Sequence, residues 1–287
     1  MRVYLRAQSD IKTQVRAVLR DTGSARWTDA EVYQAMNLAL ATWQGRVSVP
    51  MLYSLPGGLD AGVNEYAIPG YIRPPFKPQY LALGADGVQI DDTVYYEWQD
   101  IRDWDADPDA EDGWVLRIRS PISSTEARII WYAHNGSVPT TIPAIPAAGD
   151  ITATSTSVQA NAALDVGDAG YVFCGSEWMG YAGLTRAASA TTLGNLVRGV
   201  NDTTAAVHAA AATLTWGIAA PSGDLYLQLI DQTAMFLHQM FLGQASPNER
   251  DLHERMISYF KGNAEMFWRR YVPARSPRFR APATRAG

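Results

Sequence analysis

The two ends of this 287-residue chain carry apolar residues at helical spacing, and this feature constrains the fold most. Between residues 7 and 20, apolar side chains recur at i, i+4, i+7 and i+8, at Ile11, Val15, Val18 and Leu19. A second helix is predicted from a capping box of Thr28 and Glu31 toward Pro50, which cannot continue it. The N-terminal segment is therefore predicted to be a helical hairpin.

The C-terminal part repeats this pattern. Ser222 or Asp224 can cap a helix that ends at Gly243. Ser246 and Glu249 form another capping box, which opens a last helix with a buried face. Each helical pair has one wide apolar stripe and is marginal alone, so we expect the two pairs to pack together as a small bundle.

The middle of the chain has the composition of antiparallel strands. Its segments are short, rich in aromatic and β-branched residues, and separated by Gly, Asp and Pro: "NEYAIP", "QYLALGADGVQI", "TVYYEW", "WVLRIRS" and "ARIIWYAHN". In "WVLRIRS" the apolar residues Leu116 and Ile118 alternate with Arg117 and Arg119, which predicts one buried face.

Together these patterns predict an α+β fold in which terminal helices form a small bundle, with antiparallel β-domain insertions and an extended C-terminal arm. The predicted segments are an N-terminal helical hairpin (1–50), a first β region (51–138), a Pro-rich linker (139–149), an inserted small β-domain (150–220), C-terminal helices packed on the N-terminal pair (221–270) and a basic arm (271–287).

Composition excludes several classes of protein. No run approaches the roughly 18 apolar residues of a membrane span, and the N-terminus has no apolar segment of signal-peptide type. The single cysteine, Cys174, lies in an apolar strand and is expected to be buried, and the lack of disulfides fits a reducing cytoplasm. His134 is expected to end a strand, and neither His238 nor His253 has zinc spacing. We therefore expect no metal, no cofactor and no membrane partner.

The C-terminus is strongly basic. The whole chain has a net charge of −5, and without six arginines of the last nineteen residues the remainder would carry −11. Such a segment cannot fold by itself. It mixes arginines with apolar anchors that suit a docking peptide, namely Arg269, Arg270, Tyr271, Val272, Arg275, Arg278, Phe279, Arg280 and Arg285. A frayed terminus and direct contacts to DNA phosphates are the other interpretations.

The acidic run 100–112 places Asp103, Asp105 and Asp107 at the alternate spacing of a calcium loop. Such a loop needs a glycine at its sixth position and a glutamate at its twelfth, where this chain has Pro108 and Trp114. A solvated acidic loop is therefore expected, with a loose cation site as the alternative.

Residues 150–220 contain a polar motif on an apolar background. Its members are Glu177, Trp178, Tyr181, Arg198, Gly199, Thr203, Thr204 and His208. An acid, a cation and a histidine are the groups of general acid–base catalysis. No nucleophile or second carboxylate lies at a supportive spacing, so a structural role that fixes strand ends is favoured over catalysis. We expect no enzyme.

This motif resembles a small β-domain of tailed-phage virion proteins. The N-terminal segment "LRDTGSARWTDAEVYQAMNLAL" resembles the head-to-tail connector (adaptor) family of tailed bacteriophages. The resemblance covers residues 7–48, 150–220 and, loosely, 222–287.

Membership of this family implies a structural protein of the virion neck that assembles in the host bacterial cytoplasm. Copies of the chain would form a ring, of about twelve subunits, through which double-stranded DNA passes without sequence recognition. The arm would dock on the portal protein, and the β regions would contact tail or neck proteins. The alternative is a carbohydrate- or receptor-binding virion module with exposed tryptophans, while a hydrolase is disfavoured because paired carboxylates are missing.

Overall fold

The computed structural model describes residues 4–43, 46–70, 72, 76–81, 88–90, 93–95, 98–109, 113–124, 127–133, 135–144, 149–201, 203–220 and 222–270. They form two compact units. One contains the residues up to Val49 and those from Ala133 onward, and the other is Pro50–Tyr132. The predicted α+β class is confirmed, since helices and several antiparallel sheets are present.

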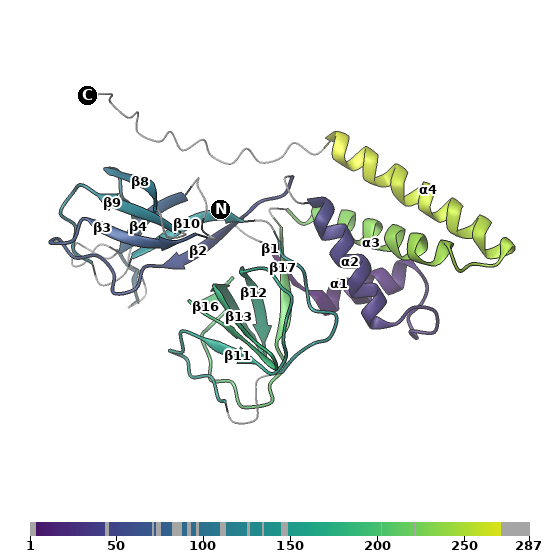
Figure 1. Ribbon diagram of the computed structural model, residues 1–287, viewed down its shortest axis with the longest axis horizontal. Coiled ribbons are helices and arrows are strands. Elements are labelled where there is room, and N and C mark those ends of the chain that lie inside the picture. The colour runs from purple at the N-terminus through teal and green to yellow at the C-terminus, as the bar shows by residue number, and fades with distance from the viewer. Residues whose placement is uncertain are drawn as a thin grey trace. The chain divides into compact units, whose positions relative to one another are not determined.

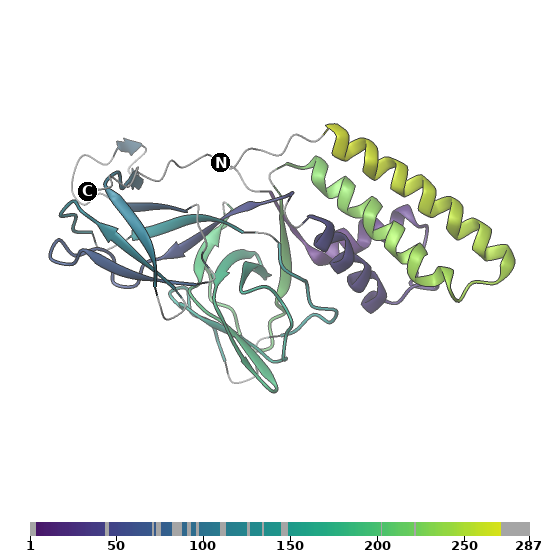
Figure 2. The ribbon, with the colours of Figure 1, turned by 45° about the horizontal axis from the view of Figure 1, so that its top comes forward.

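Among the described residues, the first unit contains four helices (Figure 1). They are α1 (Gln8–Val18), α2 (Asp29–Trp43), α3 (Asp224–Leu242) and α4 (Pro247–Arg270). Figures 1 and 2 both show α3 lying along α4 on one side and against α2 on the other. The helices from the two ends of the chain therefore form one bundle.

Both predicted capping boxes are present, but the predicted cap at Ser222 or Asp224 is wrong: α3 follows Gly223, and no side-chain hydrogen bond from a described residue caps it. The carboxylate of Glu31 accepts a bond from the Thr28 backbone N–H at 2.7 Å, and the Thr28 hydroxyl accepts one from the Glu31 N–H at 3.3 Å. In the second box, Glu249 accepts a bond from the Ser246 N–H at 3.1 Å. One boundary differs from the prediction: α2 ends at Trp43, before Pro50. The Trp43 carbonyl accepts bonds from the N–H groups of Arg46 and Val47.

A five-stranded sheet completes the first unit, in the order β1 (Tyr4–Ala7), β17 (Thr215–Ala220), β12 (Ala169–Cys174), β13 (Glu177–Ala182) and β16 (Val197–Val200). A three-stranded sheet has the order β11 (Val158–Ala160), β15 (Ala190–Leu193) and β14 (Leu184–Ala187). The pattern analysis missed β1, which pairs antiparallel with β17. The Tyr226 hydroxyl lies between these two strands, 2.5 Å from the Tyr4 carbonyl oxygen and 2.7 Å from that of Ile218.

One hydrophobic core joins the helices to the sheet. It contains residues of α1, α2, α3, β12 and β17, among them Ile11, Val15, Trp43, Val172, Trp216 and Leu229. Residues 150–220, which we expected to form an inserted β-domain, thus share their core with the helices and take their edge strand β1 from the N-terminus. The fourth helix joins through a smaller cluster of Phe260 with Ala234 and Met235 of α3.

In its described residues, the second unit contains three antiparallel sheets. The first has the strand order β2 (Val49–Ser54), β10 (Ala127–Ala133), β4 (Phe76–Leu81) and β7 (Trp98–Asp100). The second has the order β3 (Glu65–Pro69), β9 (Gly113–Ile118) and β8 (Trp104–Asp109). The third consists of β5 (Val88–Ile90) and β6 (Thr93–Tyr95). The predicted alternation in β9 is confirmed, because Leu116 and Ile118 are buried while Arg117 pairs with Glu65 and Asp107.

The acidic run differs from the expected solvated loop. Asp100 is the last residue of β7, and residues 104–109 form β8, which pairs with β9; residues 110–112 lie outside the described residues. Asp107 forms an ion pair with Arg117 of β9, and Asp105 forms one with Arg119, which directly follows β9. Opposite charges on neighbouring strands stabilise the pairing, so the aspartates are cross-strand partners.

Candidate functional site

The sequence motif forms a buried polar cluster at one end of the five-stranded sheet. Glu177 is the first residue of β13, Arg198 and Gly199 lie on the neighbouring β16, and His208 forms an isolated bridge with Ile151. The structure thus brings together an acid, a cation and a histidine that lie up to 31 residues apart in the chain. We call Glu177, Arg198 and His208 the charged cluster.

Glu177 is at the centre of the charged cluster and is fully buried. Its two carboxylate oxygens accept two parallel bonds from the Arg198 guanidinium, both 2.7 Å long. They also accept bonds from the backbone N–H groups of Gly199 at 2.9 Å and Ala206 at 3.0 Å, and lie 2.8 Å from His208 Nε2.

These partners decide the protonation state of Glu177. Burial by itself raises the pKa of this carboxyl group, but the hydrogen bonds from Arg198, Ala206, His208 and Gly199 outweigh burial and lower the pKa to about 2. At neutral pH the group is a carboxylate whose bonding capacity is filled. Arg198 also donates to the carbonyl oxygens of Thr152 and Ala206. The cluster therefore links β13 and β16 to two loops.

Other members of the motif hold the surrounding backbone. The Thr203 hydroxyl accepts a bond from the Trp178 N–H at 3.0 Å and donates to the Val200 carbonyl at 2.8 Å. The Tyr181 hydroxyl accepts a bond from the Trp216 indole at 3.1 Å. Gly199 has φ +63°, and a Cβ there would lie 2.8 Å from the Thr203 carbonyl oxygen, so only glycine fits without strain. Thr204 is exposed.

Cys174 lies beside the charged cluster and is buried, as expected. Burial raises the pKa of its thiol to about 11, with a further contribution from the charge of Glu177. The thiolate is the reactive form of cysteine, so this side chain is inert at neutral pH.

A second buried polar group, which the sequence analysis did not find, lies between the helices. His238 of α3 and His253 of α4 are both buried, and their Nδ1 atoms are 2.8 Å apart. The other nitrogen of His253 lies 3.1 Å from the guanidinium of Arg26, in the connection between α1 and α2. The histidine spacing of 15 residues across two helices gave no local signal.

The helical hairpin contains a further buried ion pair that the pattern did not predict. Arg16 of α1 donates to the Asp21 carboxylate at 2.8 Å, to the Asp29 carboxylate at 2.7 Å and to the Trp27 carbonyl at 2.8 Å. Asp21 in turn accepts bonds from the backbone N–H groups of Ala25 and Arg26. This arginine fixes the connection that carries Arg26.

The basic arm lies largely beyond what the structure describes. Arg269 and Arg270 form the exposed last turn of α4. Seven of the arm residues singled out above lie outside the described residues: Tyr271, Val272, Arg275, Arg278, Phe279, Arg280 and Arg285. His134 also lies outside them.

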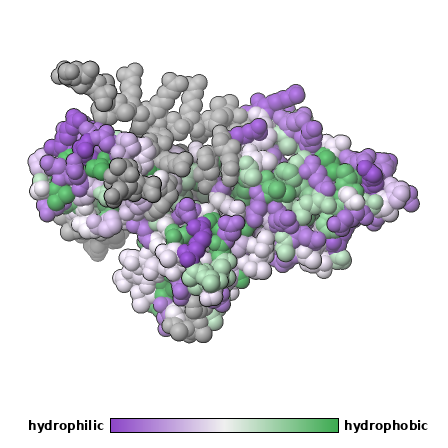
Figure 3. Space-filling model, viewed as in Figure 1, coloured by the Kyte–Doolittle hydropathy of each residue, from purple (hydrophilic) through white to green (hydrophobic). Residues whose placement is uncertain are grey.

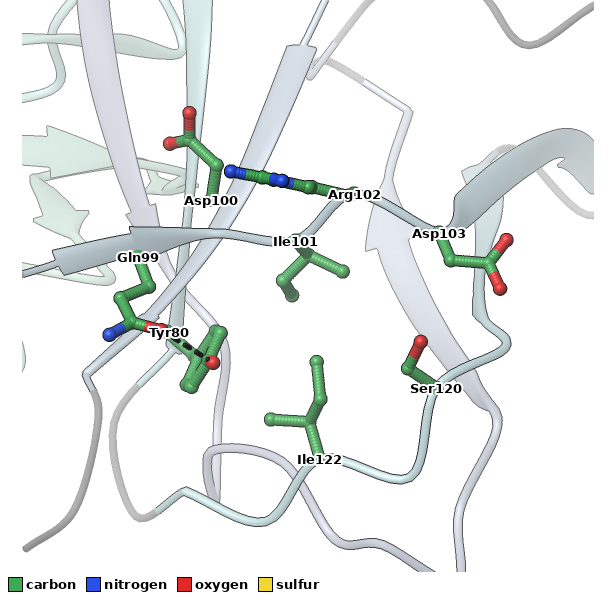
Figure 4. A pocket seen from close by; sticks show the side chains of 8 residues that line it. All are labelled: Tyr80, Gln99, Asp100, Ile101, Arg102, Asp103, Ser120 and Ile122. Atoms are coloured by element: carbon green, nitrogen blue, oxygen red, sulfur yellow. Dashed lines mark hydrogen bonds between the residues drawn. The ribbon is translucent and has the colours of Figure 1, made fainter. Parts of the chain in front are cut away.

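The second unit has an open pocket of about 690 Å³ beside β7 (Figure 4). Ile101 and Ile122 face one another across it, and Tyr80 lies at one side with its hydroxyl donating to the Gln99 side chain at 2.8 Å. Asp103 and Ser120 lie at the opposite side. The pocket thus combines two apolar side chains with hydrogen-bonding groups, as small-molecule sites commonly do.

Within the described ranges, no group of three or more His, Cys, Asp or Glu side chains is arranged to hold a metal ion. None of the helices described is both long and apolar enough to cross a membrane.

Comparison of the chain with protein-family models, with curated proteins and with solved structures found no match.

Proposed function

We propose that this chain is a ring-forming head-to-tail adaptor of a tailed bacteriophage, which docks on the portal protein through its C-terminal arm and connects it to tail or neck proteins. The observation that carries the proposal is the end of α4. There the exposed Arg269 and Arg270 lead directly into a segment with four further arginines and no acidic residue.

The bundle supports this proposal. Helices from both chain ends share one core with the five-stranded sheet, so the arm begins from a body that does not depend on it for folding. A docking segment gains from such an arrangement, since the ordering cost of binding is confined to the segment itself. Cations at the carboxyl end of α4 also interact favourably with the helix dipole, which stabilises the last turn.

The charged cluster has a supporting role in this proposal. Its carboxylate is ionised and saturated with partners, so it has no proton to donate at neutral pH and is a poor general base. We assign it the task of holding a β-domain rigid next to the bundle. Double-stranded DNA would pass through the ring without sequence recognition, and the assembled protein would belong to the virion neck.

Removal of residues 271–287 tests the proposal. The truncated chain should keep its circular dichroism spectrum and thermal midpoint, because the bundle and sheet are complete without the arm, but should no longer bind purified portal rings. A matched control replaces Tyr271, Val272 and Phe279 by Ala and keeps every arginine. Full occupancy of portal rings by the truncated chain would rule out docking through the arm.

A carbohydrate- or receptor-binding module is the second candidate, and the pocket at Tyr80 is the observation that favours it. The expected tryptophan platforms do not support it, because every tryptophan whose burial the structure describes is buried or half-buried. Two results together would favour this candidate over the adaptor. The native chain would bind a glycan but not portal rings, and Asp103→Ala and Tyr80→Ala would each lose the glycan binding.

A further inference from the structure

Three large apolar side chains form an exposed stripe along α4. Leu252, Tyr259 and Met266 are 46%, 61% and 54% exposed. Their spacing of seven residues is two helical turns, so they lie on one side of the helix and span about 21 Å along its axis. Leu227 of α3 is 64% exposed and lines the same groove as Met266. We call these four residues the α4 stripe.

The α4 stripe differs from scattered exposed apolar residues because its members on α4 recur at every second turn of one helix. Single exposed apolar residues are normal, whereas a row of them along one helix marks an interaction surface. Figure 3 shows apolar surface on the helical part of the molecule, between polar residues. Gly262 lies between two members of the stripe, and a Cβ on it would meet nothing within 4 Å, so another backbone has room to approach there.

A second exposed face lies on α2. Its exposed residues Ala30, Gln34, Leu38 and Ala41 recur at i, i+4, i+8 and i+11, on one side of the helix. None of them is charged, and Leu38 is 42% exposed. The face extends about 17 Å, close to the length of the α4 stripe. We call it the α2 face.

The two surfaces differ in the size of their side chains. The α4 stripe presents bulky side chains, whereas the α2 face has an alanine at each end, so large side chains of one helix can pack beside the small ones of the other. They lie on different helices, with α3 between α2 and α4 (Figures 1 and 2). One copy can therefore use both surfaces at once.

The charges at the helix ends are complementary when the two helices run antiparallel. The first turn of α2 carries Glu31 besides Asp29, which already pairs with Lys12 and Arg16, and the last turn of α4 carries Arg269 and Arg270. At the other end, Arg46 follows α2, with its guanidinium over the Trp268 ring of the same chain, and α4 begins with Glu249, Arg250 and Asp251. An antiparallel contact brings Glu31 toward Arg269 and Arg270, and Arg46 toward Glu249 and Asp251, whereas a parallel contact brings like charges together.

We infer that the α4 stripe of one copy packs antiparallel on the α2 face of the next copy, so that the occupant of each surface is a second copy of this chain. Because the two surfaces differ, the contact is heterologous, and its repetition produces a ring or an open filament. This inference rests on the proposed ring and names the surfaces that would close it.

The test uses the full chain and two single substitutions, Leu38→Glu on the α2 face and Tyr259→Glu on the α4 stripe. Ser258→Glu is the matched control, since it adds the same charge to an exposed neighbouring position off the stripe. Sedimentation velocity should show concentration-dependent oligomers for the native chain and the control. Each substitution alone should raise the concentration needed for association at least about tenfold, because it buries an unpaired charge.

Mixing the two variants gives the decisive result. The intact α4 stripe of Leu38→Glu can bind the intact α2 face of Tyr259→Glu, and the chain of contacts then stops, so a one-to-one mixture should give dimers and nothing larger. If Leu38→Glu associates like the native chain, two α4 stripes pair with each other and the inference is overturned. A native chain that remains monomeric at its highest soluble concentration also overturns it.

Failure here is distinguishable from failure of the proposed function. Portal binding by the native chain is measured independently, with the truncation described above. A chain that binds portal rings at full occupancy with both Leu38→Glu and Tyr259→Glu in place keeps its function as an adaptor and loses this interface.

Discussion

His238 accepts a buried hydrogen bond from His253, and the tautomers of both rings follow from their neighbours. The guanidinium of Arg26 can only donate, so the Nε2 atom of His253 must accept and its proton lies on Nδ1. That proton is donated to Nδ1 of His238, 2.8 Å away. The remaining proton of His238 lies on Nε2, a buried atom that has no hydrogen-bond partner among the described residues. The pair therefore exists only with both rings neutral.

Acid should therefore weaken the helical bundle. Burial, His253 and Arg26 lower the pKa of His238 from 6.5 to about 4, and burial and Arg26 lower the pKa of His253, which Glu249 partly opposes. Between the folded and unfolded pKa values of His238, the unfolded chain binds more protons than the folded chain, so the free energy of unfolding decreases as the pH falls from 6.5 toward 4. For His238 we expect the free energy of unfolding to decrease by an amount on the order of 2 kcal/mol between about pH 7 and about pH 4.5, measured by urea denaturation.

His238→Gln provides the control, because glutamine does not titrate. Its free energy of unfolding should change less with pH over the same interval. An equal pH dependence in the variant and the native chain would show that another group is responsible.

The Glu177 carboxylate should be among the most sensitive positions of the first unit. Glu177→Ala leaves Arg198 buried without its partner and should reduce the free energy of unfolding by about 3–5 kcal/mol. Since the folded pKa of Glu177 is lowered, its contribution is present above about pH 4.5 and is lost as the pH falls toward 2. Glu254→Ala, which breaks an exposed pair with Arg250, should cost less than about 1 kcal/mol. If chemical denaturation shows equal decreases in the free energy of unfolding for the two variants, the charged cluster does not stabilise the fold more than an exposed ion pair does.

Trp43→Ala tests the core that joins the helices to the sheet. The side chain is 1% exposed in that core, and its removal leaves a large cavity. We expect the free energy of unfolding to decrease by about 3–5 kcal/mol, measured by thermal or urea unfolding. An unchanged thermal midpoint would mean that the bundle is not held by this core.

Gly199→Ala tests the backbone of the charged cluster. The residue has φ +63°, and a methyl group there would meet the Thr203 carbonyl oxygen at 2.8 Å. We expect a loss of about 1–3 kcal/mol, from strain and from displacement of the N–H group that binds Glu177. Gly223→Ala is the control, since a Cβ there meets nothing within 4 Å and its φ of −64° suits any residue. If Gly223→Ala is destabilised as much as Gly199→Ala, the positive φ and the close contact at Gly199 do not explain the effect.

Within the arm, aromatic contacts should matter more than charge at the end of the chain. Phe279→Ala should weaken attachment to portal rings more than Arg285→Ala, because buried aromatic anchors dominate docking energy while exposed charges contribute little. Binding would be measured by co-sedimentation at two salt concentrations. A larger loss for Arg285→Ala, growing at low salt, would favour an electrostatic role such as DNA contact.

The sequence by itself determined the elements whose signals are local. The Thr28–Glu31 and Ser246–Glu249 caps, the helical periodicity and the alternation around Leu116 were readable because each involves residues within a few positions of one another. It also indicated that Glu177, Arg198 and His208 form a structural unit. It did not indicate that the backbone N–H groups of Gly199 and Ala206 complete that unit, because any residue type supplies such a donor.

Only the tertiary structure decided the features that depend on distant partners. Strand β1 is four residues long and forms because Tyr4 meets Ala220 across the sheet. Part of the acidic run forms β8 because it pairs with β9, and Arg117 and Arg119 form ion pairs with its aspartates. His238 and His253 became a hydrogen-bonded pair because α3 and α4 pack side by side, although each histidine alone resembles an ordinary helix residue. Local propensity decides which segments can form helices or strands, but pairing between segments is decided by the free energy of contacts that exist only in the folded chain.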